Sequence, residues 1–500
     1  MLGKLRLNPS DIFDNDFHGK ELRHTVVRGS MAIVMSQGMS MGLSIVNTLI
    51  LARLLTPADF GIIGMVTVII NFLAMFKDAG LSTATIQNER IDSGQISTLF
   101  WINFLISLTL GIIILISSPL VAAFYKKPEL TAVTAVLSVS FIIQGITIQH
   151  SALLQRHLKF TALALNDIIA QLCMMAVAIS MASLGFRYWA LAGGTIARTI
   201  TLVLLTYYFC PWTPGKMKKG TGAGKMLRFG GHLTGSNFVG YLSRNLDSIL
   251  IGRFIGAEPL GLYSRAFTLL MQPLNQIKAP LTTMSLPVLS SLKNEPERYK
   301  NYYRQLLDVN ISLALPVSVY CFLESEFLIR VLLGQKWMDA VPVFKILAIG
   351  GVFVATSGAP GLVMLSHGLS KRYLQLTVLT ALVIAVSFIA GIPFGINGVA
   401  VAYSVASFLI IIPLITYGFR GTPVKPGLVL RSAAGPLFAS VTAGIIAYLF
   451  IIVSDTDSIS GHIITGIIFF SIYVALTLLR SETRYTFRNI LQSMLSKSRK

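Results

Sequence analysis

Basic and acidic side chains interrupt otherwise apolar stretches of this 500-residue chain, and chemistry would use these side chains first. Inside a membrane helix an ionisable side chain costs roughly 2.5–3.5 kcal/mol, so it faces a partner, a water-filled cavity or a ligand. The basic members are Lys77, Arg198, Arg244, Arg265, Lys278 and Lys345, and the acidic members are Asp78, Asp167, Asp247, Asp308, Glu324 and Glu326.

Among these cations, Arg198, Arg265 and Lys278 have no acidic residue within four positions along the chain. Unpaired cations in the interior of a helix bundle suit an anionic ligand, and a diphosphate would engage several of them at once. The alternative is that they form ion pairs between helices, with Asp167 or Asp308 as the acid.

Arg244 and Asp247 stand three residues apart on one helix face. Arg244 is therefore either a further ligand for a diphosphate or the neutralising partner of Asp247. Intramembrane carboxylates are also what a cation-coupled transporter uses, which makes Asp247, Asp167 and Asp308 candidate coupling residues.

Two other pairs have simpler explanations. Lys77 and Asp78 lie at the end of a predicted span, where the lysine reaches the interface and pairs locally. His150 and His232 are expected to be interfacial hydrogen-bonding groups, with proton carriage as the alternative.

No catalytic constellation is visible, so we do not expect an enzyme. Cys173, Cys210 and Cys321 have unrelated spacings and no histidine pairing, and there is no HExxH or Asp-rich motif. The GTGAGK stretch (220–225) lacks the first glycine and the Ser or Thr of a phosphate-binding loop. We therefore expect no metal, no cofactor and no nucleic-acid partner.

The composition indicates an all-α polytopic membrane protein. The chain is 54% hydrophobic and only 12% charged, with a mean hydropathy of +0.70. A water-soluble protein of this size needs more charge on its surface. Uncharged runs such as Gln95–Tyr125 and Ser458–Leu479 are long enough to cross a bilayer as helices. The N-terminal residues 1–29 are polar and lack the short apolar core of a cleavable signal peptide.

About fourteen transmembrane helices are predicted, in two lobes of six followed by a final pair. The predicted spans are 30–52, 60–77, 95–118, 129–150, 162–184, 188–209, 230–252, 261–290, 305–330, 340–366, 373–393, 397–417, 431–453 and 461–479. They divide the chain into a cytoplasmic segment (1–29), an N-lobe (30–210), a basic linker against anionic headgroups (211–229), a C-lobe (230–417), and two extra helices with a basic tail (418–500).

The distribution of Lys and Arg predicts the orientation. If the N-terminus is cytoplasmic, 28 of the 41 basic residues lie in inside segments and 7 in outside loops. The positive-inside rule then places both termini in the cytoplasm.

A repeated corner indicates duplication. NTLILARLLTPADFG (47–61) and DSILIGRFIGAEPLG (247–261) align Arg53 with Arg253 and Gly61 with Gly261. Two further matches, at offsets of 209 and 210, give two parallel units related by a pseudo-two-fold axis, the usual plan of a rocking transporter. Arg53 and Arg253 are expected to anchor helix ends by satisfying terminal carbonyls and pairing with the following acid, Asp59 or Glu258.

Several separated segments resemble bacterial Wzx-type polysaccharide exporters. They are LARLLTPADFGIIGMVTVIINFLAMFKDAGLSTATIQ (51–87), LVAAFYKKPEL (120–130), DSILIGRFIGAEPLGLYSRAFTLLMQP (247–273) and VLLGQKWMDAVPVFKILAIG (331–350). The resemblance covers residues 30–417. It points to the multidrug/oligosaccharidyl-lipid/polysaccharide flippase superfamily, and within it to the colanic acid exporter group.

The resemblance implies two six-helix lobes around a V-shaped cavity that opens alternately to either side of the bacterial inner membrane. The implied cargo is an undecaprenyl-diphosphate-linked oligosaccharide for exopolysaccharide, capsule or O-antigen. The implied partners are membrane lipids, a polysaccharide polymerase and chain-length machinery. By analogy with the cavity arginines of lipid II flippases, Arg244, Arg265 and Arg198, together with Lys278, are the candidate diphosphate ligands.

Three points stay open at this stage. A cation-coupled small-molecule antiporter of the same superfamily is the main alternative, and a non-transporting scaffold is a third reading. The helix pair after residue 430 departs from family members with about twelve spans, and it would form a lipid-facing groove or contact a partner.

Overall fold

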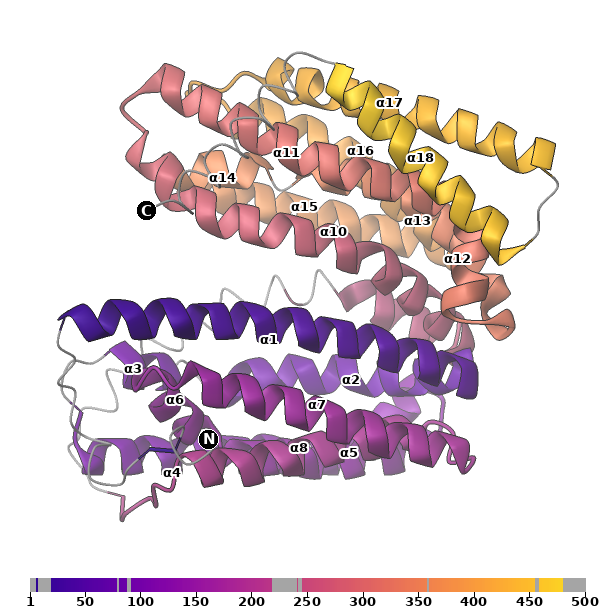
Figure 1. Cartoon of the computed structure of the whole chain (residues 1–500). Coiled ribbons are helices and arrows are strands. Elements are labelled where there is room, and N and C mark those ends of the chain that lie inside the picture. Colours follow the sequence, from indigo (N-terminus) through magenta and orange to yellow (C-terminus); the bar gives the residue numbers. More distant parts are fainter. Residues whose placement is uncertain are drawn as a thin grey trace. The chain divides into compact units, whose positions relative to one another are not determined.

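The computed structural model describes residues 6–7, 19–78, 81–87, 91–217, 241, 245–357, 359–454 and 458–479. Throughout these residues the regular structure is helical, as predicted, and no strand occurs among them. The chain divides into two compact units, Met1–Gly261 and Leu262–Lys500, each a helical bundle (Figure 1).

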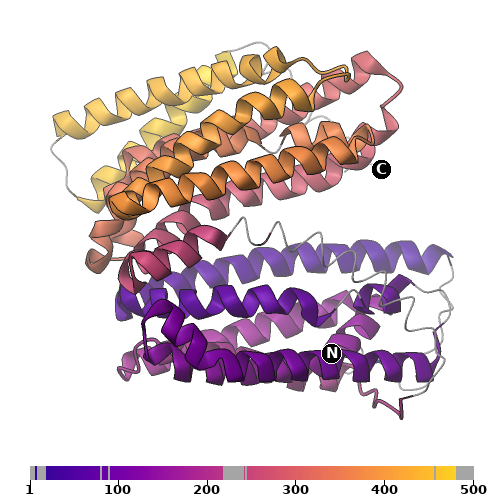
Figure 2. The same cartoon turned by 180° about the vertical axis from the view of Figure 1, so that it is seen from behind.

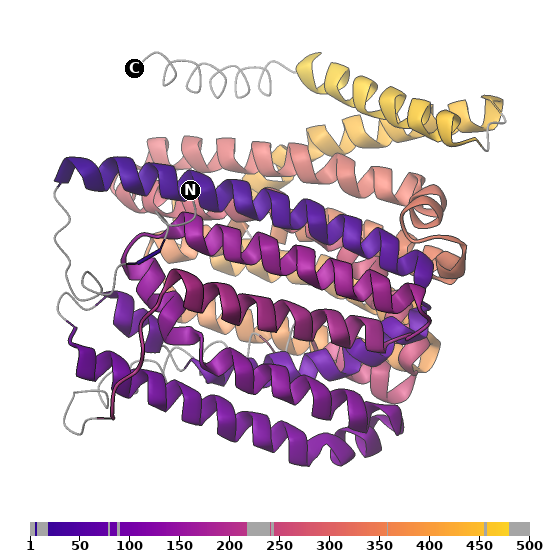
Figure 3. The same cartoon turned by 60° about the horizontal axis from the view of Figure 1, so that its bottom comes forward.

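Unit 1 is built from helices that run alongside one another, and α7 and α8 lie side by side in Figure 3. Its elements are α1 (Gly19–Leu54), α2 (Pro57–Lys77), α3 (Leu81–Gln87), α4 (Ser93–Tyr125), α5 (Glu129–Gly145), α6 (Ile148–Arg156), α7 (Phe160–Ser183) and α8 (Trp189–Phe209). Residues 245–254 are also helical, and the first turn of α10 (Ala257–Ser291) completes the unit.

The repeated corner begins a helix because its residues form a complete N-cap. Thr56 is the N-cap of α2 and Pro57 its first helical residue, and Thr56 and Asp59 bond each other's backbone amides in a capping box. The duplicated glycines meet here, because Gly61 lies against the start of α10 and Gly261 against the start of α2.

Two stretches of unit 1, residues 57–87 and 129–156, are broken helices. The run from residue 57 to 87 is divided into α2 and α3, and the span predicted at 129–150 extends to Arg156 but is interrupted after Gly145. Irregular backbone at membrane depth occurs where it is buried in protein or lines a cavity. Lys77 and Gln144 lie at the two breaks and bond to each other, Nζ to Oε1, at 2.9 Å.

Unit 2 has a core in which α10, α11, α14, α16 and α17 contribute aliphatic and aromatic side chains, including Leu289, Tyr303 and Ile415. Figure 2 shows α15 and α16 lying side by side. The elements after α10 are α11 (Pro296–Leu323), α12 (Ser325–Leu332), η2 (Gln335–Ala340), α13 (Val341–Ser357), α14 (Ala359–Ser366), α15 (Ser370–Gly391), η3 (Ile392–Phe394), α16 (Gly395–Gly418), α17 (Pro426–Ser454) and α18 (Ile459–Leu479).

The ninth predicted span, 305–330, extends past the end of the observed helix. We expected a helix over 305–330, but α11 ends at Leu323 and α12 starts at Ser325. The cause is Glu324, a buried carboxyl that bonds His462 on α18 at 2.8 Å and so fixes the chain at the break. The C-terminal pair α17 and α18 packs on α11 through Phe469 and Tyr473.

The backbone repeats the duplication seen in the sequence. Leu158 and Gly368 both have positive φ, +53° and +73°, and stand 210 residues apart. Gly185 and Gly395, at +83° and +71°, have the same separation. Each of these four residues follows the end of a helix with a positive φ, so corresponding turns of the two repeats share this backbone feature.

Within the described residues, ten stretches are long and apolar enough to cross a membrane. One of them, Ser370–Gly418, contains both α15 and α16. The class predicted from composition, a polytopic α-helical membrane protein, is confirmed, and the count of fourteen spans stays a prediction.

Candidate functional site

Arg198 is engaged by an acid on the neighbouring helix. Its Nη2 lies 2.6 Å from Oδ1 of Asp167, and the other carboxylate oxygen accepts a 2.9 Å hydrogen bond from Ser40 on α1. The side chains of Arg198 and Asp167 are 39% and 42% exposed, so the pair lies on an accessible face of unit 1. Of the two alternatives for Arg198, the structure has the ion pair between helices.

The other candidate carboxylates also have local partners. Asp308 lies 3.8 Å from Nε of Arg304, one turn earlier on α11. Asp247 is buried, and its Oδ1 accepts a hydrogen bond from the amide of Ser248 at 2.6 Å. Arg265 is half-buried on the third turn of α10, whereas Arg244 and His232 lie outside the described residues.

The corner arginines occupy helix ends, and the acids near them have further contacts. Arg53 is in the last turn of α1. Asp59 completes the α2 cap and lies 3.5 Å from Nε of Arg187. The guanidinium of Arg253 stacks over the rings of Phe124 and Phe254, each centroid 5.6 Å away, an arrangement that stabilises a cation at an interface.

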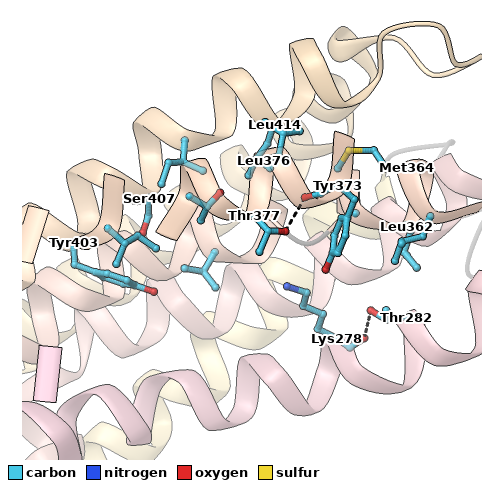
Figure 4. A pocket seen from close by; sticks show the side chains of 16 residues that line it. Lys278, Thr282, Leu362, Met364, Tyr373, Leu376, Thr377, Tyr403, Ser407 and Leu414 are labelled. Atoms are coloured by element: carbon cyan, nitrogen blue, oxygen red, sulfur yellow. Dashed lines mark hydrogen bonds between the residues drawn. The ribbon is translucent and has the colours of Figure 1, made fainter. Parts of the chain in front are cut away.

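Lys278 has a different setting from these residues. It lies in the middle of α10, and its side chain borders a cavity of about 380 Å³ in unit 2. Figure 4 shows the side chain reaching from α10, with its ammonium directed across the cavity toward the side formed by Tyr373 and Thr377. In the part of the chain that the structure describes, no hydrogen bond or ion pair reaches this ammonium.

The cavity wall combines hydroxyl groups with aliphatic surface. Its lining residues are Lys278 and Thr282 from α10; Val354 from α13; Gly361, Leu362, Met364 and Leu365 from α14; Tyr373, Leu376, Thr377, Thr380 and Ile384 from α15; and Tyr403, Ser407, Ile410 and Leu414 from α16. Such a wall can hold one anionic group at the lysine while an apolar chain lies against the leucines.

Two hydroxyls of this wall bond to their own helices. Thr282 donates to the carbonyl of Lys278 at 3.0 Å, and Thr377 to the carbonyl of Tyr373 at 2.8 Å. Hydroxyls bonded in this way are satisfied within the helix and can rotate toward a ligand.

The comparisons with known proteins agree with this architecture. The family model described as "Polysaccharide biosynthesis protein" matches residues 50–342. The chain belongs to this family. Among curated relatives, this polysaccharide biosynthesis protein is 27% identical to the teichuronic acid biosynthesis protein TuaB of Bacillus subtilis, covering 75% of this chain and 79% of that one. It is 23% identical to the lipopolysaccharide biosynthesis protein WzxC of Escherichia coli, covering 69% and 70%.

Two solved structures share the fold of this family member. A lipid II flippase, MurJ, superposes with a TM-score of 0.74 at 14% identity, covering 92% of this chain and all of that one. An inward-facing multidrug transporter of the MATE family superposes with a TM-score of 0.61 at 15% identity, covering 80% and 98%. The polysaccharide biosynthesis protein is thus a multi-pass inner-membrane protein whose fold is shared with a lipid flippase and a multidrug transporter.

Sequence reasoning singled out Lys278 but missed the hydroxyls opposite it. Tyr373, Thr377, Tyr403 and Ser407 fall in the uncharged run 373–419, which we interpreted only as two helices. The available signal was the run of hydroxyl residues at helical spacing, because Tyr373 and Thr377 are one turn apart, as are Tyr403 and Ser407.

Proposed function

We propose that the protein flips undecaprenyl-diphosphate-linked oligosaccharide repeat units across the inner membrane for the assembly of surface polysaccharide. Family membership supports a role in polysaccharide biosynthesis, and the fold is that of transporters and of a lipid flippase. The relatives are named for teichuronic acid and lipopolysaccharide, and another for succinoglycan transport.

The observation that carries the proposal is the cavity at Lys278. A lipid-linked precursor joins an anionic diphosphate to an aliphatic chain and a sugar rich in hydroxyls. The lysine offers one positive charge, the Thr, Ser and Tyr hydroxyls offer hydrogen bonds, and Leu362, Leu376 and Leu414 offer apolar contact. A charge without a partner in this setting would be neutralised by the substrate.

In the proposed mechanism the two repeats alternate in opening toward the cytoplasm and the outside. The cationic residues hold the diphosphate during the change, so that its charge never meets the lipid tails. Arg265 and Arg244 are proposed to add to Lys278, and Arg198 to contribute when its pair with Asp167 opens. We also propose that both termini are cytoplasmic and that a polymerase and chain-length proteins receive the product.

The cation-coupled antiporter is the second candidate, and the contacts of the carboxylates weigh against it. A coupling site needs an acid that is free to bind the cation. Asp167 is held by Arg198 and Ser40, and Asp308 lies beside Arg304. A guanidinium that already neutralises Asp167 competes with a transported cation for that carboxylate.

The decisive experiment is flipping in liposomes. Purified protein is reconstituted with a fluorescent undecaprenyl-diphosphate oligosaccharide, and the fraction that becomes accessible outside is measured over time. We expect Lys278→Ala to slow flipping at least about tenfold, since one charge-assisted contact to a diphosphate is worth roughly 1.5–3 kcal/mol. Lys371→Ala, which removes an exposed lysine at the start of α15, is the matched control. Equal rates for both variants and the wild type would refute the proposed role of the cavity.

A further inference from the structure

Lys77 and Lys278 occupy adjacent, not identical, positions in the two repeats. The spacing of 200 residues that brings Gly261 to the start of α2 also aligns Ala79 with Ala279, Leu81 with Leu281, and Thr83 with Thr283. The two lysines fall one position apart in this alignment. One stands at the end of α2 and the other at the same level of α10.

The lysine of unit 1 is held by two neighbouring side chains. Its Nζ donates to Oε1 of Gln144 at 2.9 Å and lies 5.5 Å from the centre of the Phe141 ring. The amide of Gln144 is itself fixed, because Nε2 donates to Oγ1 of Thr199 at 3.3 Å. The charge of Lys77 is therefore satisfied within the protein, where the lysine braces α2 against α5.

Neither of the groups that hold Lys77 has an equivalent beside Lys278. The 210-residue separation of Leu158 from Gly368 places Val354 at the position of Gln144 and Gly351 at that of Phe141. The geometry agrees with this assignment. Val354 is the residue of α13 that borders the cavity together with Lys278. A Cβ on Gly351 would come within 3.4 Å of Leu274, one turn before Lys278 on α10.

We infer that the lysines at this level of the two repeats have different roles, a structural brace in unit 1 and an anion subsite in unit 2, and that Val354 keeps the subsite open. The side chain of valine cannot accept a hydrogen bond, and a glycine offers no ring. Lys278 consequently keeps its charge for a ligand. The aliphatic wall selects a phosphate or diphosphate group attached to an apolar chain.

The inference rests on the proposed function for the identity of the cargo, but the subsite itself can be tested by binding alone. The full chain is purified in detergent and titrated with undecaprenyl diphosphate, monitored by a change in intrinsic fluorescence. Val354→Gln rebuilds the acceptor that Lys77 has, and Val354→Leu enlarges the side chain without adding one. We expect Val354→Gln to weaken binding about tenfold, as Lys278→Gln does, and Val354→Leu to change it less than about threefold.

Two further variants keep the result interpretable. In Val354→Gln combined with Lys278→Gln we expect no loss beyond that of Lys278→Gln alone, because both changes act on one interaction. Gln144→Val is expected to lower the unfolding temperature, because it removes the hydrogen bond through which Lys77 braces the two helices. It should leave binding unchanged. If Val354→Gln binds like the wild type, or if Gln144→Val weakens binding as much as Lys278→Gln, the division of roles is wrong.

Competition separates the sources of the phosphate. Three unlabelled compounds are compared as competitors of bound undecaprenyl diphosphate: inorganic pyrophosphate, phosphatidylglycerol and undecaprenyl diphosphate itself. Strong competition by undecaprenyl diphosphate alone supports a cargo subsite. Equal competition by phosphatidylglycerol overturns the assignment to the cargo in favour of a bilayer phospholipid. Normal binding combined with absent flipping would count against the proposed function and leave the subsite intact.

Discussion

Gly61 and Gly261 are in reciprocal contact, each against the backbone that begins the other's helix. A Cβ on Gly61 would lie 1.7 Å from the carbonyl oxygen of Ala257, and one on Gly261 would lie 1.8 Å from that of Pro57. All four residues belong to unit 1. The near-equal distances are those expected at a pseudo-two-fold axis, and only a hydrogen atom fits at either position.

We therefore predict that Gly61→Ala and Gly261→Ala each lower the free energy of unfolding by about 3 kcal/mol, the upper end of overpacking costs. The double variant should lose less than the sum, because separating the helices once relieves both collisions. Thermal unfolding in detergent measures the effect. Gly38→Ala on α1, where nothing lies within 4 Å, is the control and should be neutral or stabilising.

The cap of α2 gives a second prediction. Asp59 is buried and completes the capping box, while its ion-pair partner Arg187 has a side chain that is 67% exposed. An exposed partner adds little, so the cap should dominate. We expect Asp59→Ala to cost about 1–2 kcal/mol of stability and Arg187→Ala less than about 0.5 kcal/mol. Comparable losses in the two variants would mean that the ion pair, and not the cap, stabilises the corner.

The pair of Asp167 and Arg198 yields a prediction about coupling. If the guanidinium is the permanent partner of the carboxylate, Asp167→Asn should leave the dependence of flipping on imposed sodium or proton gradients unchanged. It should lower stability only modestly, by up to about 1 kcal/mol, because both side chains are partly exposed. Flipping rates in liposomes with and without each gradient test this. If the variant flips but no longer responds to a gradient, cation-coupled antiport becomes the better explanation.

Glu324 predicts a dependence of stability on pH. The carboxyl lies between α11 and α12, and burial raises its pKa above the usual 4.5, while His462 opposes the shift. A raised pKa in the folded state means that the stabilising contribution is fully present below the unfolded pKa and is lost as the pH rises through the folded one. The unfolding temperature of the wild type should therefore fall over this window relative to that of Glu324→Gln, which mimics the protonated acid. Parallel profiles from pH 4 to 8 would exclude Glu324 as the origin.

Helix positions followed from the sequence because uncharged apolar runs leave the backbone few alternatives in a membrane. The breaks did not follow, since Glu324 interrupts its helix only by bonding a histidine far along the chain. The ion-pair partner of a buried or half-buried charge could not be predicted from the sequence either. Arg198 had two candidate acids, and only packing places Asp167 beside it. Lys77 was expected to reach the interface and pair with its neighbour Asp78, yet it bonds Gln144 on another helix.

Lys278 could be singled out because a cation without a nearby acid is conspicuous in an apolar helix. Its openness to a ligand could not be deduced, because it depends on what α13 places opposite. The proposed role of Val354 emerges only from a comparison with Gln144. That comparison needs both the register of the repeat and the contacts of Lys77.

The hydroxyls around the cavity bear on how long a cargo would stay. Thr282 and Thr377 already donate to carbonyls of their own helices, so a departing ligand leaves these two donors satisfied. Donors left without acceptors would hold the cargo and slow its release, whereas donors that return to their helices let it go at little cost. A site of this kind favours short residence times, which suits a protein that must release each repeat unit before it can accept the next.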